Sequence, residues 1–166
     1  MIGLLQRVSR ASVDVEGERV AAIGPGLLVL LGVERGDGQA QAERLLDRLL
    51  GYRVFEDEAG RMNRSLLEVG GELLLVPQFT LAADTSHGRR PGFSKAAAPE
   101  QGRHWFDVFV RMAQLRHPST RAGRFGADMQ VALVNDGPVT FWLQVSPPEE
   151  GHRGAGNNRS VRKFRP

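Results

Sequence analysis

The sequence contains no cysteine. Without a thiol, the chain cannot form a disulfide, a thiolate metal site or a cysteine nucleophile. A chain of this composition suits a reducing compartment, and we expect the protein to be cytoplasmic.

Long apolar runs are also absent. The longest wholly apolar stretch, residues 27–31, is far shorter than the roughly 20 residues that a membrane-spanning helix needs. The first ten residues, MIGLLQRVSR, place their charge after the apolar positions, which is not the layout of a signal peptide. We therefore expect a soluble, unexported protein without a membrane partner.

The excess of positive charge is confined to one end of the chain. Residues 147–166 hold five cations and two anions, which accounts for the whole net charge of +3. This segment is rich in Gly, Pro, Asn and Arg and poor in apolar residues, so we expect it to be disordered in isolation. Two interpretations are equally supported: the tail binds RNA phosphates, or it only increases solubility. Residues 1–146 have the size of a single domain, and the whole chain is 41% hydrophobic, which is enough for a substantial core.

Within this domain, short apolar segments alternate with two amphipathic patterns. Residues 39–52 and 99–115 repeat their apolar positions at helical spacing, and Asp37 is a candidate N-cap for the first helix. Glu16-Gly17 predicts a hairpin turn, and residues 129–134 and 139–145 are expected to be two strands. The pattern predicts an α+β fold with a curved, barrel-like, largely antiparallel sheet and two main helices.

Three segments are candidates for chemistry. In VPQFTLAAD a strand ends in Pro77 and then presents Gln78 and Thr80 on one side of the chain and Phe79 on the other. An edge strand explains this pattern as well as a reactive site does. In VNDGPVTFWLQV, Gly137-Pro138 is a strong turn signal, and the pattern alone predicts a hairpin corner.

The third segment, HGRRPGFSKAA, is a glycine-bearing loop with three cations, Arg89, Arg90 and Lys95. Such a loop is typical both of a phosphate or RNA contact and of an ordinary solvated surface.

A conventional hydrolytic centre is not visible. None of the four histidines lies within the Gln78-Thr80 or Gly137-Thr140 segments, and there is no G-x-S-x-G or H-E-x-x-H motif. Because a hydroxyl is a weak nucleophile without a positioned base, a triad mechanism is disfavoured. We expect no metal and no cofactor.

Several long blocks resemble one known family, the D-aminoacyl-tRNA deacylases of bacteria and eukaryotes. The resemblance covers residues 1–145 and is carried, in order, by LLQRVSRASV, IGPGLLVLLGVERGD, FEDEAGRMNRSLLEVGGELLLVPQFTLAADTSHGRRPGFSKAA and GRFGADMQVALVNDGPVT. It implies a barrel-like α+β homodimer that binds aminoacyl-tRNA in pockets at the subunit interface. The implied reaction is hydrolysis of the ester that joins a D-amino acid to tRNA.

The resemblance also assigns roles to individual residues. Gly137-Pro138 corresponds to a cis peptide that projects into the partner's pocket and sterically rejects L residues, and Arg7 corresponds to a residue that braces it. Glycine has no side chain to reject, so glycine mischarged on alanine tRNA is an implied second substrate.

The catalytic segment departs from the family at one position, because Pro77 stands where a serine is usual. Mechanisms that use that serine are therefore in doubt for this chain. A related branch that tolerates L-alanine also has this proline, but Gly137-Pro138-Val139-Thr140 agrees with the D-specific branch. We expect main-chain N–H groups around Phe79 and Thr80 to stabilise the oxyanion beside Gln78. The 2′-hydroxyl of the RNA would orient the water, with Thr80 as a secondary aid.

Two further residues are candidates for the adenine pocket. Phe125 and Met129 in GRFGADM either line that pocket or belong to the core. Two rival functions remain, a nucleic-acid-binding barrel without catalysis and a general small-molecule esterase, and the second is disfavoured by the missing activated nucleophile.

Overall fold

The computed structural model of the protein describes residues 1–147, so the predicted tail lies outside the described residues apart from Pro147. The strands are β1 (Ile2–Val15), β2 (Glu18–Ile23), β3 (Gly26–Gly32), β4 (Phe55–Glu56), β5 (Met62–Arg64), β6 (Glu72–Pro77), β7 (Thr120–Ala122) and β8 (Met129–Gln144). The helices are α1 (Gln39–Gly51), α2 (Leu66–Val69) and α3 (Pro99–Arg116), with a short 3-10 helix η1 (Phe79–Ala82). None of these helices is long and apolar enough to cross a membrane.

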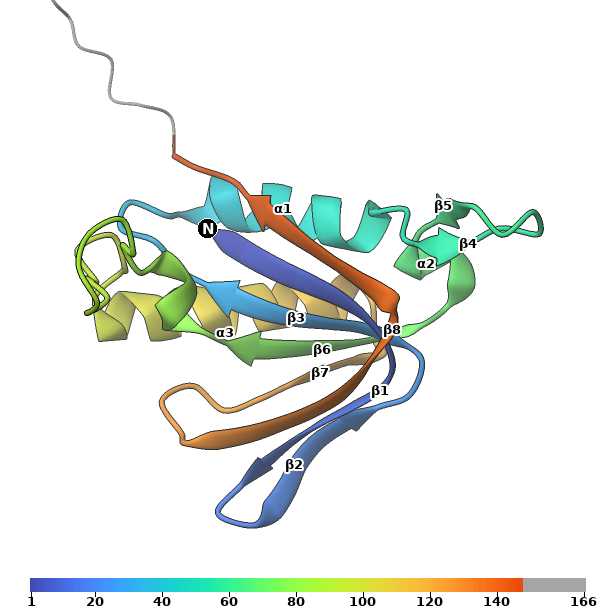
Figure 1. The fold of residues 1–166 in the computed structure, drawn as a ribbon, viewed down its shortest axis with the longest axis horizontal. Coiled ribbons are helices and arrows are strands. Elements are labelled where there is room, and N and C mark those ends of the chain that lie inside the picture. Colours follow the sequence, from blue (N-terminus) through green and yellow to red (C-terminus); the bar gives the residue numbers. More distant parts are fainter. Residues whose placement is uncertain (148–166) are drawn as a thin grey trace, which may run out of the picture.

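The main sheet is mixed: its longest pairings are antiparallel, as predicted, and it also contains two parallel pairs that were not predicted. Strand β1 pairs antiparallel with β2, β3 and β8, whereas the β3–β6 and β6–β7 pairs are parallel. The parallel pairs follow from connectivity: α1 lies between β3 and β6 in the chain, and α3 lies between β6 and β7 (Figure 1). A crossover through a helix returns the chain to the end of the sheet where the first strand began, so the next strand runs parallel to it.

The hairpin predicted at Glu16-Gly17 is confirmed. Both residues have a positive φ, 52° and 82°, and they join β1 to β2. Glycine adopts this conformation without steric cost, which is why the turn occurs at this point of the sequence.

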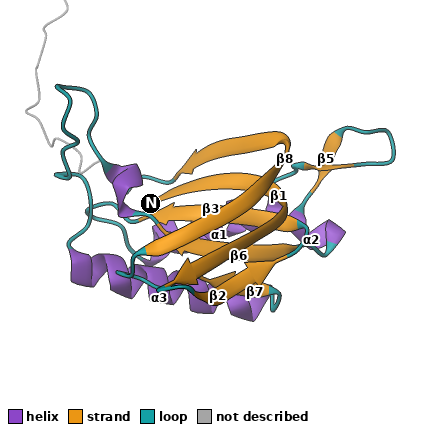
Figure 2. Cartoon of the chain, turned by 60° about the horizontal axis from the view of Figure 1, so that its bottom comes forward, coloured by secondary structure: helices purple, strands orange, loops and turns teal. Residues whose placement is uncertain are grey.

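The alternation of side chains along β3 divides the core in two. Leu27, Val29 and Leu31 are buried beneath α1 and α3, which pack on the same face of the sheet (Figure 2). Leu28 points to the other face, where it meets Leu74 and the inner side chains of β1, β2 and β8. Each fully buried leucine contributes about 2 kcal/mol relative to an exposed one. The second cluster exists because the sheet curls over itself into an open barrel.

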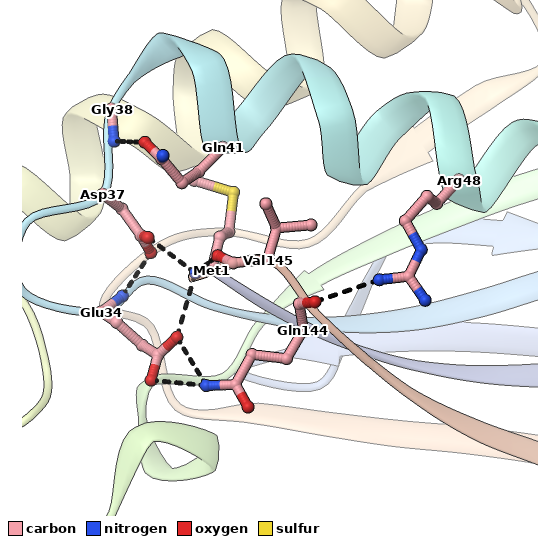
Figure 3. A network of polar contacts seen from close by, with 8 residues as sticks. All are labelled: Met1, Glu34, Asp37, Gly38, Gln41, Arg48, Gln144 and Val145. Atoms are coloured by element: carbon pink, nitrogen blue, oxygen red, sulfur yellow. Dashed lines mark hydrogen bonds and ion pairs between the residues drawn. The ribbon is translucent and has the colours of Figure 1, made fainter. Parts of the chain in front are cut away.

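The predicted N-cap role of Asp37 is wrong, because its carboxylate has a different partner. The N-cap of α1 is Gly38, and Asp37 instead accepts a hydrogen bond from the α-ammonium group of Met1 at 2.6 Å (Figure 3). Glu34 and the carbonyl of Val145 take the other two protons of the ammonium, at 3.0 and 2.7 Å. Burial raises the pKa of Asp37, and the ammonium opposes this by favouring the charged form. The network ties both ends of the domain to the loop that follows β3.

The predicted hairpin corner at Gly137-Pro138 is also wrong. Both halves of β8 pair with β1 in the same direction, through Val8↔Asn135 before the Gly-Pro pair and Gln6↔Thr140 after it. Residues 136–139 therefore bulge out opposite the single residue Arg7, and the chain does not reverse. The two strands expected at 129–134 and 139–145 are one bulged strand.

Candidate active site

The VPQFTLAAD segment leaves the sheet at the end of β6 and turns into η1. The Gln78 N–H donates to the carbonyl of Leu31 at 2.8 Å, which anchors the segment to the end of β3. The next turn is closed by Leu81 N–H donating to the Gln78 carbonyl at 3.2 Å. The first N–H groups of a helix have no partner within it, so those of Phe79 and Thr80 are left for another acceptor.

Pro77 lies at a place where a missing N–H is tolerated. Because the Gln78 N–H points to β3, the nitrogen of Pro77 points to the β7 side of β6. Pairing with β7 has already ended there, at Leu75↔Ala122. A proline is therefore accommodated at position 77 without breaking a ladder hydrogen bond.

The first of two cavities opens beside this turn. It has a volume of about 250 Å³ and lies between the end of β3, the start of α3 and the loop after β7. Its lining is Leu31, Val33, Gln78, Phe79, Ala97, Pro99, Gly102, Phe106, Phe125 and Gly126. A flat, largely apolar molecule is the kind of ligand that suits such walls.

The second cavity, of about 310 Å³, shares a wall with the first. Its lining is Val76, Pro77, Gln78, Phe79, Phe125, Gly126, Ala127, Met129 and Val131. Gln78, Phe79 and Phe125 thus face both cavities, and Met129 faces the second. Among the described residues, neither lining contains a titratable side chain.

The hydroxyl of Thr80 is placed beside Gln78. The side-chain amide of Gln78 donates to the Thr80 hydroxyl oxygen at 2.5 Å, and the Thr80 side chain is exposed. This contact leaves the hydroxyl proton free to be donated, but an amide cannot remove it. Thr80 can therefore orient a water molecule, whereas activation as a nucleophile would need a base that these residues do not supply.

Phe125 is held by α3. The Arg103 guanidinium lies 5.0 Å from the centre of the Phe125 ring and donates to the Phe125 carbonyl at 3.3 Å. On the same helix, a Cβ placed on Gly102 would lie 3.3 Å from the Phe125 ring. The absence of a side chain at Gly102 thus keeps the first cavity open. Sequence reasoning missed Gly102, because a single glycine inside a helix forms no motif. The available signal was that glycine is unfavourable inside a helix, so its presence there indicates a packing or functional reason.

The Gly137-Pro138 segment is exposed, and the buried side chain of Arg7 is hydrogen-bonded to the residue before it. The peptide bond between the two residues is cis, and Gly137 has a φ of 123°. Arg7, which is only 7% exposed, donates through Nε to the carbonyl of Asp136 at 3.2 Å and through Nη1 to the carbonyl of Val54 at 2.6 Å.

Asn135 fixes the other side of the bulge. Its amide donates to the carbonyls of Arg7 and Val139, at 2.9 and 3.0 Å, and its oxygen accepts from the hydroxyl of Thr140 at 3.2 Å. Both main-chain ends of the bulge are therefore hydrogen-bonded to the body of the domain.

The two candidate segments lie at opposite ends of the sheet. Gly137-Pro138 projects opposite Arg7, whereas η1 packs against Gly32, the partner of Ile2 in the ladder. The five residue steps along β1 from Ile2 to Arg7 span about 16 Å. Figure 1 shows η1, in green, at one end of the sheet and the bend of β8 at the other. Within one chain the structure does not bring these segments together.

Arg89, Arg90 and Lys95 are exposed on the loop that follows η1. Among residues 1–147, no cluster of three or more potential metal ligands of the His, Cys, Asp or Glu type occurs.

Comparison with known proteins identifies the group to which this arrangement belongs. A model of the D-Tyr-tRNA(Tyr) deacylase family matches residues 4–144. The chain belongs to this family. Similar relatives are the D-aminoacyl-tRNA deacylases of Thioalkalivibrio sulfidiphilus (strain HL-EbGR7) and Paracidovorax citrulli (strain AAC00-1), 65% and 62% identical over 148 residues. These alignments cover 89% of this chain and 99% and 96% of the relatives.

Solved structures agree on the fold of this deacylase family. One described as "c-Myc DNA Unwinding Element Binding Protein" is 39% identical with a TM-score of 0.85, and the match covers 89% of this chain and all of that one. A probable eukaryotic D-amino acid tRNA deacylase has a TM-score of 0.74 at 19% identity, over 87% of this chain and 98% of that one. The family model and the relatives of 62–65% identity make the chain a hydrolase that acts on D-aminoacyl-tRNA, as the sequence predicts.

Proposed function

We propose that this deacylase hydrolyses D-aminoacyl-tRNA and glycine mischarged on alanine tRNA, rejects L-aminoacyl-tRNA, and so proofreads chirality in translation. The observation that carries the proposal is a site divided in two. Among residues 1–147, no titratable side chain lines the cavities beside Gln78, and the hydrogen-bonded Gly137-Pro138 bulge lies at the other end of the sheet.

The catalytic step follows from what lines the cavities. Attack of water on the ester carbonyl forms a tetrahedral oxyanion, which the main-chain N–H groups of Phe79 and Thr80 stabilise. No side chain there removes a proton from the water, so the 2′-hydroxyl of the terminal ribose orients it, with Thr80 as a secondary aid. The bond between the carbonyl carbon and the ribose oxygen then breaks, and this leaving oxygen takes the proton that the water released and becomes a free hydroxyl.

The terminal adenosine is assigned to the first cavity, with its base beside Phe125. The apolar walls suit a purine, and Phe125 provides a π-face for stacking. The aminoacyl group then extends into the second cavity, past Gln78 and towards Met129.

Chiral selection acts between subunits of a homodimer in this proposal. About 16 Å of β1 separates the Gly137-Pro138 bulge from the cavities of its own chain, so the bulge reaches a cavity only if that cavity belongs to a second copy. Arg7 and Asn135 hold the bulge so that an incoming side chain cannot displace it. An L residue collides with this main chain, whereas a D residue directs its side chain away from it. Glycine has no side chain, so it is accepted as well.

A panel of three substrates tests the proposed function. We expect free amino acid to be released from D-tyrosyl-tRNA and from glycyl-tRNA made with alanine tRNA, and not from L-tyrosyl-tRNA. Release from none of them would favour a nucleic-acid-binding barrel without catalysis, and equal release of D- and L-tyrosine would favour an unselective esterase.

Thr80→Ala tests whether the 2′-hydroxyl of the RNA, and not Thr80, is the main group that orients the attacking water. The substitution removes a secondary contact, so we expect kcat on D-tyrosyl-tRNA to fall by no more than about 100-fold, with unchanged tRNA binding. Thr80→Ser, which keeps the hydroxyl, should remain close to the wild type. A loss approaching a million-fold, the cost of removing a nucleophile, would assign the attack to Thr80 instead.

A further inference from the structure

Two exposed phenylalanines lie in contact at the rim of the cavities. Phe79 is 57% exposed and Phe93 is 41% exposed, with ring centres 5.2 Å apart and ring planes inclined by 47°. Phe79 belongs to the catalytic turn, and Phe93 comes from the loop that carries Arg89, Arg90 and Lys95. Neighbouring apolar side chains exposed together on a surface commonly mark a binding site.

The backbone of this loop holds Phe93 in place. Asp84 and Gly92 exchange two main-chain hydrogen bonds, at 2.7 and 3.0 Å, which close the loop on itself. Beyond Phe93, the Arg35 N–H donates to the Lys95 carbonyl at 2.8 Å.

The turn inside the loop is also hydrogen-bonded. The hydroxyl and the N–H of Ser86 donate to the carboxylate of Asp84, at 2.6 and 3.0 Å. These contacts lower the pKa of Asp84, so its carboxylate keeps them at neutral pH. Hydrogen bonds within the loop therefore fix the position of Phe93 beside Phe79.

The charges on the loop that carries Phe93 indicate the chemistry of the ligand. Arg89, Arg90 and Lys95 are exposed. The one acidic residue from position 84 to position 95 is Asp84, and its carboxylate already accepts a hydrogen bond from the Ser86 hydroxyl. Exposed aromatic rings next to cations are the combination that binds single-stranded nucleic acid, with the rings stacking on bases and the cations meeting phosphates.

We propose that the Phe79–Phe93 pair binds the base of the nucleotide immediately 5′ to the terminal adenosine, and that Arg89, Arg90 and Lys95 contact the adjoining phosphates. This subsite rests on the proposed function, since it requires the adenosine to occupy the first cavity. Phe79 lines that cavity and is also 57% exposed. An RNA chain that leaves the cavity in the 5′ direction therefore passes this ring. The 3′ end of tRNA is single-stranded, so its bases are free to stack.

The test varies the length of the RNA that carries the amino acid. Steady-state kinetics of the wild type, Phe93→Ala and Phe93→Tyr are compared on D-tyrosyl-adenosine, on D-tyrosyl-cytidyl-cytidyl-adenosine and on full D-tyrosyl-tRNA. We expect Phe93→Ala to raise KM about tenfold on the two longer substrates, the range lost with one stacked base, with kcat and the adenosine substrate unchanged. Phe93→Tyr keeps the ring and should restore KM.

Other outcomes would overturn the subsite. An equal rise in KM on all three substrates would make Phe93 a support for the catalytic turn, and no rise on any would leave it without an RNA contact. A changed sedimentation coefficient of Phe93→Ala would place the pair in a contact between copies of the chain. Hydrolysis of D-tyrosyl-adenosine by the wild type tests the proposed function separately, because that substrate lacks the upstream nucleotide.

Discussion

Gly137→Ala is expected to lower kcat/KM for D-tyrosyl-tRNA by about 100-fold, the usual cost of displacing a site by about 1 Å, and to abolish the preference for D over L. The added Cβ would lie 2.7 Å from a methyl carbon of Val139 and 3.1 Å from Nη2 of Arg7. Gly137 also has a φ of 123°, which a residue with a side chain rarely adopts. The bulge must therefore shift, and Arg7 with it. The measurement is single-turnover hydrolysis of D- and L-tyrosyl-tRNA.

Gly51→Ala is the matched control, because a Cβ at Gly51 would meet no atom of residues 1–147 within 4 Å. It should leave both rates unchanged. If Gly137→Ala kept full activity and full discrimination, the bulge would have no part in selecting the substrate.

Gly102→Leu is expected to lower kcat/KM on D-tyrosyl-tRNA by a similar factor of about 100, chiefly through KM. The new side chain would grow towards Phe125 from a Cβ only 3.3 Å from its ring, and it would fill the cavity assigned to adenosine. Leucine favours the helix over glycine by about 1 kcal/mol, so α3 should persist.

Thermal unfolding separates occlusion of this cavity from loss of the fold. We expect Gly102→Leu to unfold within a few degrees of the wild type, and Gly51→Leu to keep both its stability and its activity. An active Gly102→Leu variant would mean that the adenosine binds elsewhere.

Local patterns in the sequence predict much of the fold. The helical spacing at 39–52 and 99–115 predicts α1 and α3 to within a residue at each end, and Glu16-Gly17 predicts the β1–β2 turn. The parallel strands were missed although the order of strand and helix patterns carried the signal. Each of the two long helices follows one strand of the sheet and precedes another, and such connections favour parallel neighbours.

The remaining errors concern contacts between residues far apart in the chain. Asp37 carries the right chemistry for a cap, but its partner is the ammonium group of Met1, which no local pattern reveals. Gly137-Pro138 has the composition of a hairpin corner, and only its pairing with β1 on both sides makes it a bulge. The role of Gly102 likewise depends on the position of Phe125, more than twenty residues away.

Mixed dimers of two impaired variants test the central claim most directly. Gly137→Ala keeps an open cavity and has a displaced bulge, whereas Gly102→Leu has a blocked cavity and an intact bulge. If the bulge of one subunit completes the cavity of the other, co-expression of the two variants with different tags gives a purified heterodimer that has one complete site. The account predicts that this heterodimer hydrolyses D-tyrosyl-tRNA far faster than either parent and spares L-tyrosyl-tRNA; a heterodimer no more active than its two parents would contradict it.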